Sequence, residues 1–494
     1  MKVRFDLEFW GNKLLGYIAF GLNIIQQMFR GVDLSSNIIE LLDSYVTEAM
    51  STFRIPGLSV SVIKNNSILY SKGFGARNLE ENLPTTPNTL YGIGSVTKSF
   101  TALAIMQLVE ASKLDIHDPV KKYIPLKIGF DERPIEIFHL LTHSSGVPNL
   151  GQAEIVIKRG LGFYESWIPM TSFEDFMQFV NGASEEIAAK PGERFFYFNE
   201  GYTMLGKIIE VVSGMNYEDY IREKILKPLK MTRSTFLKEE FEADPDIMTP
   251  YYIDREGKPV PAKFPFNKLI YAAGGLLSSV SELSNYVIAN MNDGVFDGIQ
   301  IVDSSLLKEM HTPRIEVNLF LLGFEKRSYG YGWIILDDFF GHKVVYHSGS
   351  VGVCGAFVAF IPDFKVGVAI ASNGSPDSLS ILGLGILTLL IGRKPDELPF
   401  IALDKKLDML VGVYESYKGI NRASVVKRGS TLYLEIKDKL WEMNVPLIPV
   451  DERLEEYRFY IVEGGVKIPV EFVVDSSGKI DLYIERHRLH KVKS

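Results

Sequence analysis

The sequence predicts a mixed α/β domain followed by an all-β barrel, and three observations lead to this fold class. Alternating apolar stretches on either side of Asn65-Asn66, between residues 57 and 78, predict a hairpin of two strands. Segments of helical periodicity follow, among them 95–114 and 202–213, and two β-rich runs lie between 342 and 373, so distant strands close one mixed sheet. Beyond residue 405, short alternating strands separated by turns predict an antiparallel meander or small barrel.

The 494 residues suffice for about three folding units. We assign 1–35 to an N-terminal arm, 36–395 to the large domain and 405–494 to the barrel. The stretch near 393–404 contains two prolines and several charges, which is typical of a linker. Within the barrel we expect strands over residues 431–436, 457–462, 466–474 and 480–485.

The N-terminal arm carries an amphipathic pattern. Apolar residues recur at helical spacing from Leu15 to Phe29, and we expect this stripe to pack on its own protein or a sister subunit rather than on a membrane surface. Asp6 and Glu8 stand where a secretion signal needs basic residues. The apolar run Leu379 to Ile391 is shorter than the roughly 20 residues that cross a bilayer, so it predicts a buried helix and no membrane span.

Charge and composition exclude several classes of protein. Lysine and arginine number 53 against 61 aspartates and glutamates, a net charge of −8, so we expect no nucleic-acid partner. Cys354 is the only cysteine, so neither an internal disulfide nor a cysteine–zinc cluster forms. This suits a reducing compartment, and we expect a cytoplasmic protein. Glutamine occurs only six times, which agrees with a thermophilic source.

Two histidines, His139 and His143, stand four residues apart, a spacing that can bind a metal ion on a helix. No acidic general base lies between them, and no third ligand stands nearby. We therefore interpret both as structural histidines and expect neither a metal nor a cofactor.

The sharpest local feature is the pair Ser95 and Lys98 at the opening of an amphipathic helix. The two residues are three apart, so their side chains share one face of that helix. A serine hydroxyl becomes a nucleophile when a base takes its proton, and a desolvated lysine can be that base. A phosphate-binding loop is the rival interpretation, but it requires glycine directly before the lysine, where this chain has Thr97.

Two further motifs follow in order, Tyr197-Phe198-Asn199 and His347-Ser348-Gly349. With the Ser-x-x-Lys segment they resemble the serine β-lactamase and penicillin-binding-protein-like hydrolases, in particular the branch of class C β-lactamases, D-Ala-D-Ala carboxypeptidases and D-aminopeptidases. The resemblance includes HLLTHSSG (139–146), AAGGLLSSVSEL (272–283) and YGYGW (329–333). It implies an antiparallel sheet flanked by helices with an all-helical insertion. The tail from 405 to 494 resembles the lipocalin-like barrels that some D-aminopeptidase-type members carry.

The resemblance implies a catalytic role for three residues. Ser95 attacks a carbonyl and becomes acylated, while Lys98 and Tyr197 share the work of accepting its proton. A Tyr197 phenolate beside a Lys98 ammonium and a neutral Lys98 are both ways to a base, and the sequence leaves the choice open.

The resemblance assigns the other motif residues to substrate binding. The N–H groups of Ser95 and Ser350 form an oxyanion hole, Asn199 bonds Lys98 or the substrate amide, and Gly349 lies on the strand that edges the site. Where β-lactamases of this branch usually present lysine, this chain presents His347, whose ordinary pKa is about 6.5. An imidazolium there would bind a substrate carboxylate only below about that pH, and the deacylating glutamate of class A enzymes has no counterpart.

These motifs support the hypothesis of a serine hydrolase that acts through an acyl-enzyme. A peptidase of carboxypeptidase or aminopeptidase type is the first choice, with D-amino-acid-containing peptides favoured. A carboxylesterase or β-lactamase on the same site is the alternative, and a non-catalytic penicillin-binding-like sensor or scaffold is the alternative from another class. The expected partner is a small peptide or ester substrate, and the chain could form a homo-oligomer.

Overall fold

The structure is a computed structural model that describes residues 34–493 apart from 131, 164–167, 169, 318–320, 322, 325, 375–377 and 438–441. The amphipathic stripe predicted for the N-terminal arm lies outside the described residues. Contacts divide the chain into two compact units, of which one covers Arg54–Gly392 and the other joins Arg393–Ser494 to the segment that ends at Phe53. Among the helices of the described ranges, none has the length and apolar character needed to span a membrane.

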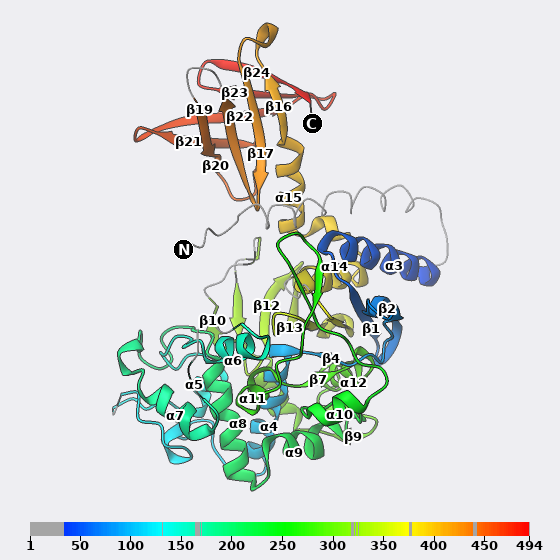
Figure 1. Cartoon of the computed structure of the whole chain (residues 1–494), viewed down its shortest axis with the longest axis vertical. Helices are drawn as coiled ribbons and strands as arrows, with labels where there is room; N and C mark the ends of the chain where they lie inside the picture. The colour runs from blue at the N-terminus through cyan, green and yellow to red at the C-terminus, as the bar shows by residue number, and fades with distance from the viewer. Residues whose placement is uncertain are drawn as a thin grey trace. The chain divides into compact units, whose positions relative to one another are not determined.

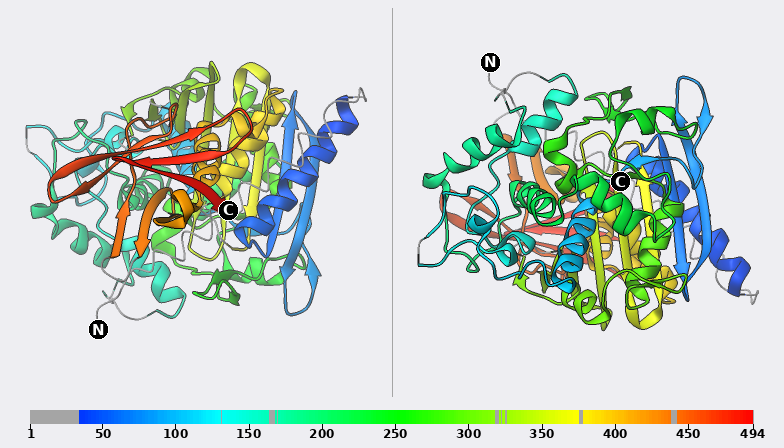
Figure 2. Two further views of the ribbon diagram at one scale, coloured as in Figure 1. Left: turned by 90° about the horizontal axis from the view of Figure 1, so that it is seen from above. Right: turned by 90° about the horizontal axis from the view of Figure 1, so that it is seen from below.

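A nine-stranded antiparallel sheet forms the centre of the larger unit (Figure 1). Strand β1 pairs with β15, which brings residues near 60 beside residues near 370; Figure 2 shows β1 and β2 next to the later strands. The predicted closure of one sheet by distant segments is therefore confirmed. In spatial order the strands are β10 (Ile315–Glu316), β11 (Arg327–Tyr329), β12 (Ile334–Phe339), β13 (His342–Ser350), β14 (Gly355–Ile361), β15 (Val366–Ser372), β1 (Gly57–Lys64), β2 (Ser67–Asn78) and β3 (Leu83–Pro84).

The predicted hairpin at 57–78 is confirmed. Strands β1 and β2 pair antiparallel, and the two residues between them, Asn65 and Asn66, have φ values of 49° and 62°. A tight hairpin turn requires positive φ at both central positions, and asparagine tolerates it better than other side chains.

Helices cover both faces of the sheet at its centre, where β14 and β15 are buried along their whole length. Helix α12 (Val280–Met291) packs on one face, where Val287 contacts Gly367, and α14 (Leu379–Leu390) packs on the other, where Gly383 contacts Phe357. Gly367 pairs with Phe360 of β14, so these two residues face the same side of the sheet. Side chains alternate along a strand, so Phe357, three residues from Phe360, faces the other side. The two helices therefore lie on opposite faces. The buried helix predicted at 379–391 is thus confirmed.

The helical region lies between the two groups of strands in sequence. The predicted segment 95–114 is the 3-10 turn η1 (Gly94–Val96) continued by α4 (Thr97–Glu110), and 202–213 belongs to α8 (Asn199–Ser213). Short strands β4 (Tyr91–Gly92) and β7 (Leu277–Ser278) pair beside η1. The remaining helices are α5 (Ile137–Leu141), α6 (Gln152–Gly160), α7 (Phe173–Asn181), α9 (Tyr217–Ile221), α10 (Lys238–Ala243), α11 (Tyr271–Gly274) and α13 (Ser304–Met310).

The smaller unit contains helix α3 (Leu34–Phe53), helix α15 (Pro399–Leu410) and a second nine-stranded antiparallel sheet, which curves into a nearly closed barrel (Figure 1). Buried and exposed residues alternate along its strands, as in Thr431–Lys437, so one face lines a separate core. The predicted barrel is confirmed. In spatial order its strands are β19 (Glu442–Pro446), β18 (Thr431–Lys437), β17 (Arg422–Arg428), β16 (Gly412–Glu415), β24 (His487–Lys493), β23 (Ile480–Ile484), β22 (Val466–Val474), β21 (Arg458–Glu463) and β20 (Ile448–Pro449).

The stretch predicted as a linker, near 393–404, begins where the smaller unit resumes at Arg393, and most of it is helical. Pro399 is the first residue of α15, a position where proline costs nothing because the N–H it lacks has no partner in a helix. Lys427 of β17 forms ion pairs with Asp404 at 2.6 Å and Asp408 at 2.9 Å, two carboxylates one turn apart on α15. These buried pairs hold the helix on the barrel, so the proline and charges that suggested a linker have structural roles.

Candidate active site

Ser95 lies in η1, where the chain turns from β4 into α4, and its side chain is partly exposed. The preceding Gly94 has φ +53°, and a Cβ on it would lie 2.4 Å from the backbone nitrogen of Ser350. Only glycine fits this close approach at positive φ. The sequence therefore folds so that the serine turn rests directly against the end of β13.

Lys98, on the first turn of α4, points its ammonium at Ser95. Its Nζ lies 3.0 Å from Oγ of Ser95, 2.8 Å from Oδ1 of Asn199 and 2.7 Å from the carbonyl oxygen of Ala273. The three N–H groups of the ammonium thus meet three acceptors, from η1, α8 and α11. The structure brings Ser95, Lys98 and Asn199 together, and of the two partners suggested for Asn199 it shows Lys98.

Burial changes the proton affinity of Lys98. The side chain is fully buried, and this burial lowers the pKa of Lys98 to about 7, against the smaller opposing effects of Glu154 and Glu200. Near neutral pH a substantial fraction of the molecules therefore carries an uncharged amine beside the Ser95 hydroxyl.

Tyr197 lies two residues before α8, with its ring centroid 4.8 Å from Nζ of Lys98. Burial raises the pKa of Tyr197 well above its ordinary value, and a hydrogen bond with the Ser95 side chain opposes the rise only in part. Tyr197 is therefore a neutral phenol near pH 7. Of the two bases that the sequence left open, the pKa directions favour neutral Lys98.

His143 holds the Tyr197 segment in place. Its carbonyl oxygen accepts from the N–H of Phe196 at 2.8 Å, its Nδ1 accepts from the N–H of Phe198 at 2.9 Å, and its ring centroid lies 4.3 Å from that of Tyr197. Burial lowers the pKa of His143 well below its ordinary value, so the ring is neutral. His143 and His139 are both buried side chains with hydrogen bonds to the backbone, and across the described residues no three His, Cys, Asp or Glu gather as a metal site would require.

His347 is also neutral. Its Nδ1 lies 2.6 Å from the carbonyl oxygen of Ser348, and its Nε2 lies 3.0 Å from the hydroxyl of Tyr329. Because a carbonyl only accepts, Nδ1 carries the proton and Nε2 accepts from Tyr329. Burial and the neighbouring Lys98 lower the pKa of His347 to about 3, so the imidazolium considered for carboxylate binding does not form near neutral pH.

Two backbone N–H groups converge beside the serine. The Val351 N–H donates to the Cys354 carbonyl oxygen, so these two residues form a hydrogen-bonded pair. Hydrogen-bonded and non-hydrogen-bonded pairs alternate along an antiparallel ladder, so the adjacent pair Ser350–Gly355 is not hydrogen-bonded. The Ser350 N–H therefore points away from β14. On that side β12 pairs with β13 only as far as Tyr346. A Cβ on Gly349 would lie 2.5 Å from the nitrogen of Ser95, so Gly349 allows the two N–H groups to approach each other.

These residues surround a cavity of about 350 Å³. Ser95, Tyr197, Tyr329, His347 and Ser350 line it. Arg327 also lines it, a residue that the sequence offered no motif to find. The side chain of Lys98 lies beneath the cavity, where the three acceptors hold it.

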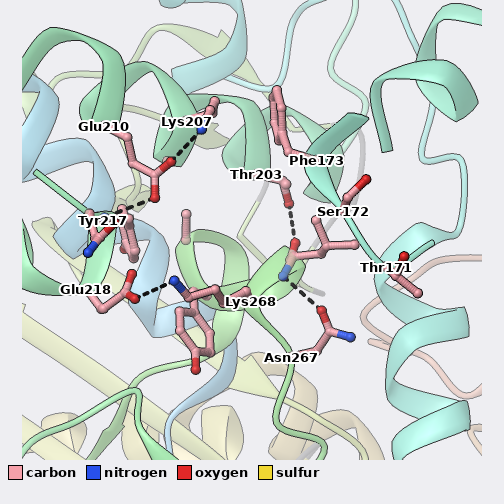
Figure 3. A pocket seen from close by; sticks show the side chains of 15 residues that line it. Thr171, Ser172, Phe173, Thr203, Lys207, Glu210, Tyr217, Glu218, Asn267 and Lys268 are labelled. Atoms are coloured by element: carbon pink, nitrogen blue, oxygen red, sulfur yellow. Dashed lines mark hydrogen bonds and ion pairs between the residues drawn. The ribbon is translucent and has the colours of Figure 1, made fainter. Parts of the chain in front are cut away.

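A second cavity, of about 500 Å³, lies among α7, α8, α9 and α11 in the same unit (Figure 3). Its charged groups pair with each other, Lys207 with Glu210 at 2.9 Å and Lys268 with Glu218 at 2.8 Å. None of its lining residues carries a nucleophile poised beside a base, so the Ser95 cavity is the candidate active site.

The fold and the Ser95 cluster define a serine hydrolase, and comparisons with known proteins agree. A sequence model described as Beta-lactamase matches residues 42–383, more than half of the chain. The chain therefore belongs to the Beta-lactamase family. A second model, described as the Pab87 octamerisation domain, matches residues 395–490.

Individual relatives give the same result. The solved structure of the octameric penicillin-binding protein homologue from Pyrococcus abyssi is 43% identical, with a TM-score of 0.84, and the match covers 92% of this chain and all of that one. Penicillin-binding protein 4* of Bacillus subtilis (strain 168) is 25% identical over 86% of this chain and 92% of its own length. Protein flp of Staphylococcus aureus (strain MW2) is 26% identical, and this chain spans only 66% of its length.

Proposed function

We propose that the chain is a peptidase that cleaves short peptides, with D-amino-acid-containing peptides favoured, through an acyl-enzyme on Ser95. The observation that carries this proposal is the contact of 3.0 Å between Ser95 Oγ and the buried Nζ of Lys98, a group whose pKa lies at about 7. A base with a pKa near the working pH combines a large deprotonated fraction with enough basicity to take a proton.

The proposed reaction begins when Oγ of Ser95 attacks the substrate carbonyl carbon and passes its proton to Nζ of Lys98. The N–H groups of Ser95 and Ser350 stabilise the oxyanion. Collapse of the tetrahedral intermediate breaks the C–N bond, and the leaving nitrogen takes the proton from the Lys98 ammonium. A water molecule then attacks the acyl-enzyme, with Lys98 again as base, and releases the acid and free Ser95.

In this proposal three neighbouring residues position Lys98 and Ser95. Asn199 and the carbonyl of Ala273 fix Nζ of Lys98, and the Tyr197 hydroxyl orients Oγ of Ser95 through their hydrogen bond. Tyr197 stays protonated throughout, because burial raises its pKa. This division of labour differs from a phenolate mechanism, in which Lys98 would stay charged.

A substrate panel tests the proposal. We expect kcat/KM to rank D-amino-acid peptides above their L counterparts, and above p-nitrophenyl esters and nitrocefin. A higher value for esters would make the chain a carboxylesterase, and a higher value for nitrocefin a β-lactamase. Acylation of Ser95 without turnover of any substrate would indicate a penicillin-binding sensor.

We further propose that the chain assembles as a homo-octamer through residues 395–490 of its smaller unit. The proposal rests on the match of residues 395–490 to an octamerisation domain and on the likeness to an octameric protein from Pyrococcus abyssi. Light scattering on the full chain should give eight times the monomer mass. A monomer at micromolar concentration would contradict this proposal without affecting the chemistry at Ser95.

A further inference from the structure

The cavity beside Ser95 contains a single charged side chain. Of the described residues that line it, Arg327 is the only lysine, arginine, aspartate or glutamate. His347, the other group that could carry a positive charge there, is neutral because its Nε2 accepts from Tyr329 and its pKa lies at about 3. Among the described side chains that line the cavity, a substrate anion therefore has one ionic partner.

The backbone of β11 directs Arg327 toward this cavity. Side chains two residues apart in a strand share a face, so Arg327 lies on the same face as Tyr329, whose hydroxyl contacts His347. Leu336 of β12 pairs with Arg327, and Val317 donates its N–H to the Arg327 carbonyl, so the backbone of Arg327 is held from both sides.

The guanidinium of Arg327 has unused hydrogen-bonding capacity. Its Nε is buried without a hydrogen-bond partner, and within the described ranges no carboxylate forms an ion pair with it. A buried N–H group without a hydrogen-bond partner costs free energy. The guanidinium that carries it is also a cation among neutral side chains, so it attracts an anion. Arginine presents its donors in a planar fork that matches a carboxylate.

We propose that Arg327 binds the free C-terminal carboxylate of a peptide substrate, which makes the proposed peptidase one of carboxypeptidase type. This inference rests on the proposed function. In a carboxypeptidase substrate, the carboxylate belongs to the residue that leaves, so its partner must share the cavity of the nucleophile. An aminopeptidase would instead need an acidic side chain there for the substrate ammonium, and no described residue lining the cavity supplies one.

The test compares an N-acetylated peptide that ends in D-alanine with the same peptide as a C-terminal amide. We expect the wild-type chain to prefer the free acid in kcat/KM by about tenfold or more, as charge-assisted hydrogen bonds allow. Arg327→Gln should lower this acid-to-amide ratio at least tenfold, and Arg327→Lys, which keeps the charge, should lower it less. Lys326→Gln removes the same charge from the exposed neighbouring residue and should leave the ratio at the wild-type value.

Three outcomes separate the claims. A lower ratio in Arg327→Gln but not in Lys326→Gln supports the assignment. An unchanged ratio in both Arg327 variants, or no wild-type preference for the acid, overturns it while leaving the peptidase proposal intact. If the wild-type chain cleaves neither peptide, the peptidase proposal fails and the assignment of Arg327 fails with it. If Arg327→Gln does not fold, Arg327→Lys tests the assignment. A lysine ammonium cannot form the two parallel hydrogen bonds of a guanidinium to a carboxylate, so the acid-to-amide ratio of this variant should still fall below the wild-type value.

Discussion

The Nζ atom of Lys98 lies 3.0 Å from Oγ of Ser95, one helical turn earlier in the chain. Two further acceptors, Asn199 Oδ1 and the Ala273 carbonyl, fix the amine, so its lone pair can face only the serine once a proton is lost. The same burial that makes this geometry rigid lowers the pKa of Lys98 to about 7. Burial of Lys98 therefore accounts both for the fixed position of its amine and for its lowered pKa.

Replacement of Lys98 by methionine should slow acylation of Ser95 by about 10²–10⁴-fold, the usual contribution of a general base. Methionine fills the same buried space without an amine, so the loss measures the base and not a cavity. Stopped-flow acylation by a chromogenic ester is the measurement. Lys207→Met, at a half-exposed lysine paired with Glu210, is the control and should acylate at the wild-type rate. Equal rates in both variants would remove Lys98 from the chemistry.

The value of kcat/KM for an uncharged ester should rise with pH and level off above about 7. The sign follows from Lys98: its pKa is lowered to about 7, so the amine loses its proton and becomes a base as the pH increases through that value. The pKa of Tyr197 is raised, so this residue adds no change below about 9. A profile that is flat from pH 5.5 to 9, or that falls, contradicts neutral Lys98 as the base.

The variant His143→Ala should lower both stability and acylation. The N–H of Phe198 would lose its acceptor, which costs about 1–3 kcal/mol for a buried donor, and Tyr197 would lose the ring it packs against. We expect a lower melting temperature together with a smaller kcat. His117→Ala, at a largely exposed histidine, should change neither quantity. If His143→Ala keeps full kcat at a temperature where it is folded, His143 does not position Tyr197.

Alanine at Gly349 should abolish acylation, because its Cβ would lie 2.0 Å from the Ile93 carbonyl oxygen and 2.5 Å from the Ser95 nitrogen. The strand and η1 would have to separate, and the two N–H groups would no longer point at one oxygen. Gly182→Ala is the matched control, since its Cβ meets no atom closer than 3.4 Å and its φ is −76°. Normal acylation by Gly349→Ala would show that the close approach of β13 and η1 is dispensable.

Local patterns predicted much of this molecule. The hairpin at Asn65-Asn66, the buried helix α14 and the alternating barrel strands follow from periodicity and turn chemistry, which act over a few residues. The sequence did not predict helix α15 within the linker stretch, because Pro399 begins this helix and a proline at the first position of a helix resembles a proline that interrupts one.

The motifs located Ser95, Lys98, Tyr197 and Asn199, but contacts from distant segments decide their states. The charge of His347 depends on Tyr329 and on burial, so its ordinary pKa was a misleading guide. Arg327 belongs to no motif and reaches the site only because β11 and β13 lie on the two sides of β12. Sequence spacing carries no information about such pairs.

Intact-mass spectrometry after incubation with a penicillin or a fluorophosphonate tests the central claim, that Ser95 is the acylated nucleophile. We predict one adduct per chain in the wild-type protein, mapped by peptide digestion to Ser95, and none in Ser95→Ala. An adduct on another residue, or equal labelling of Ser95→Ala, would contradict the account.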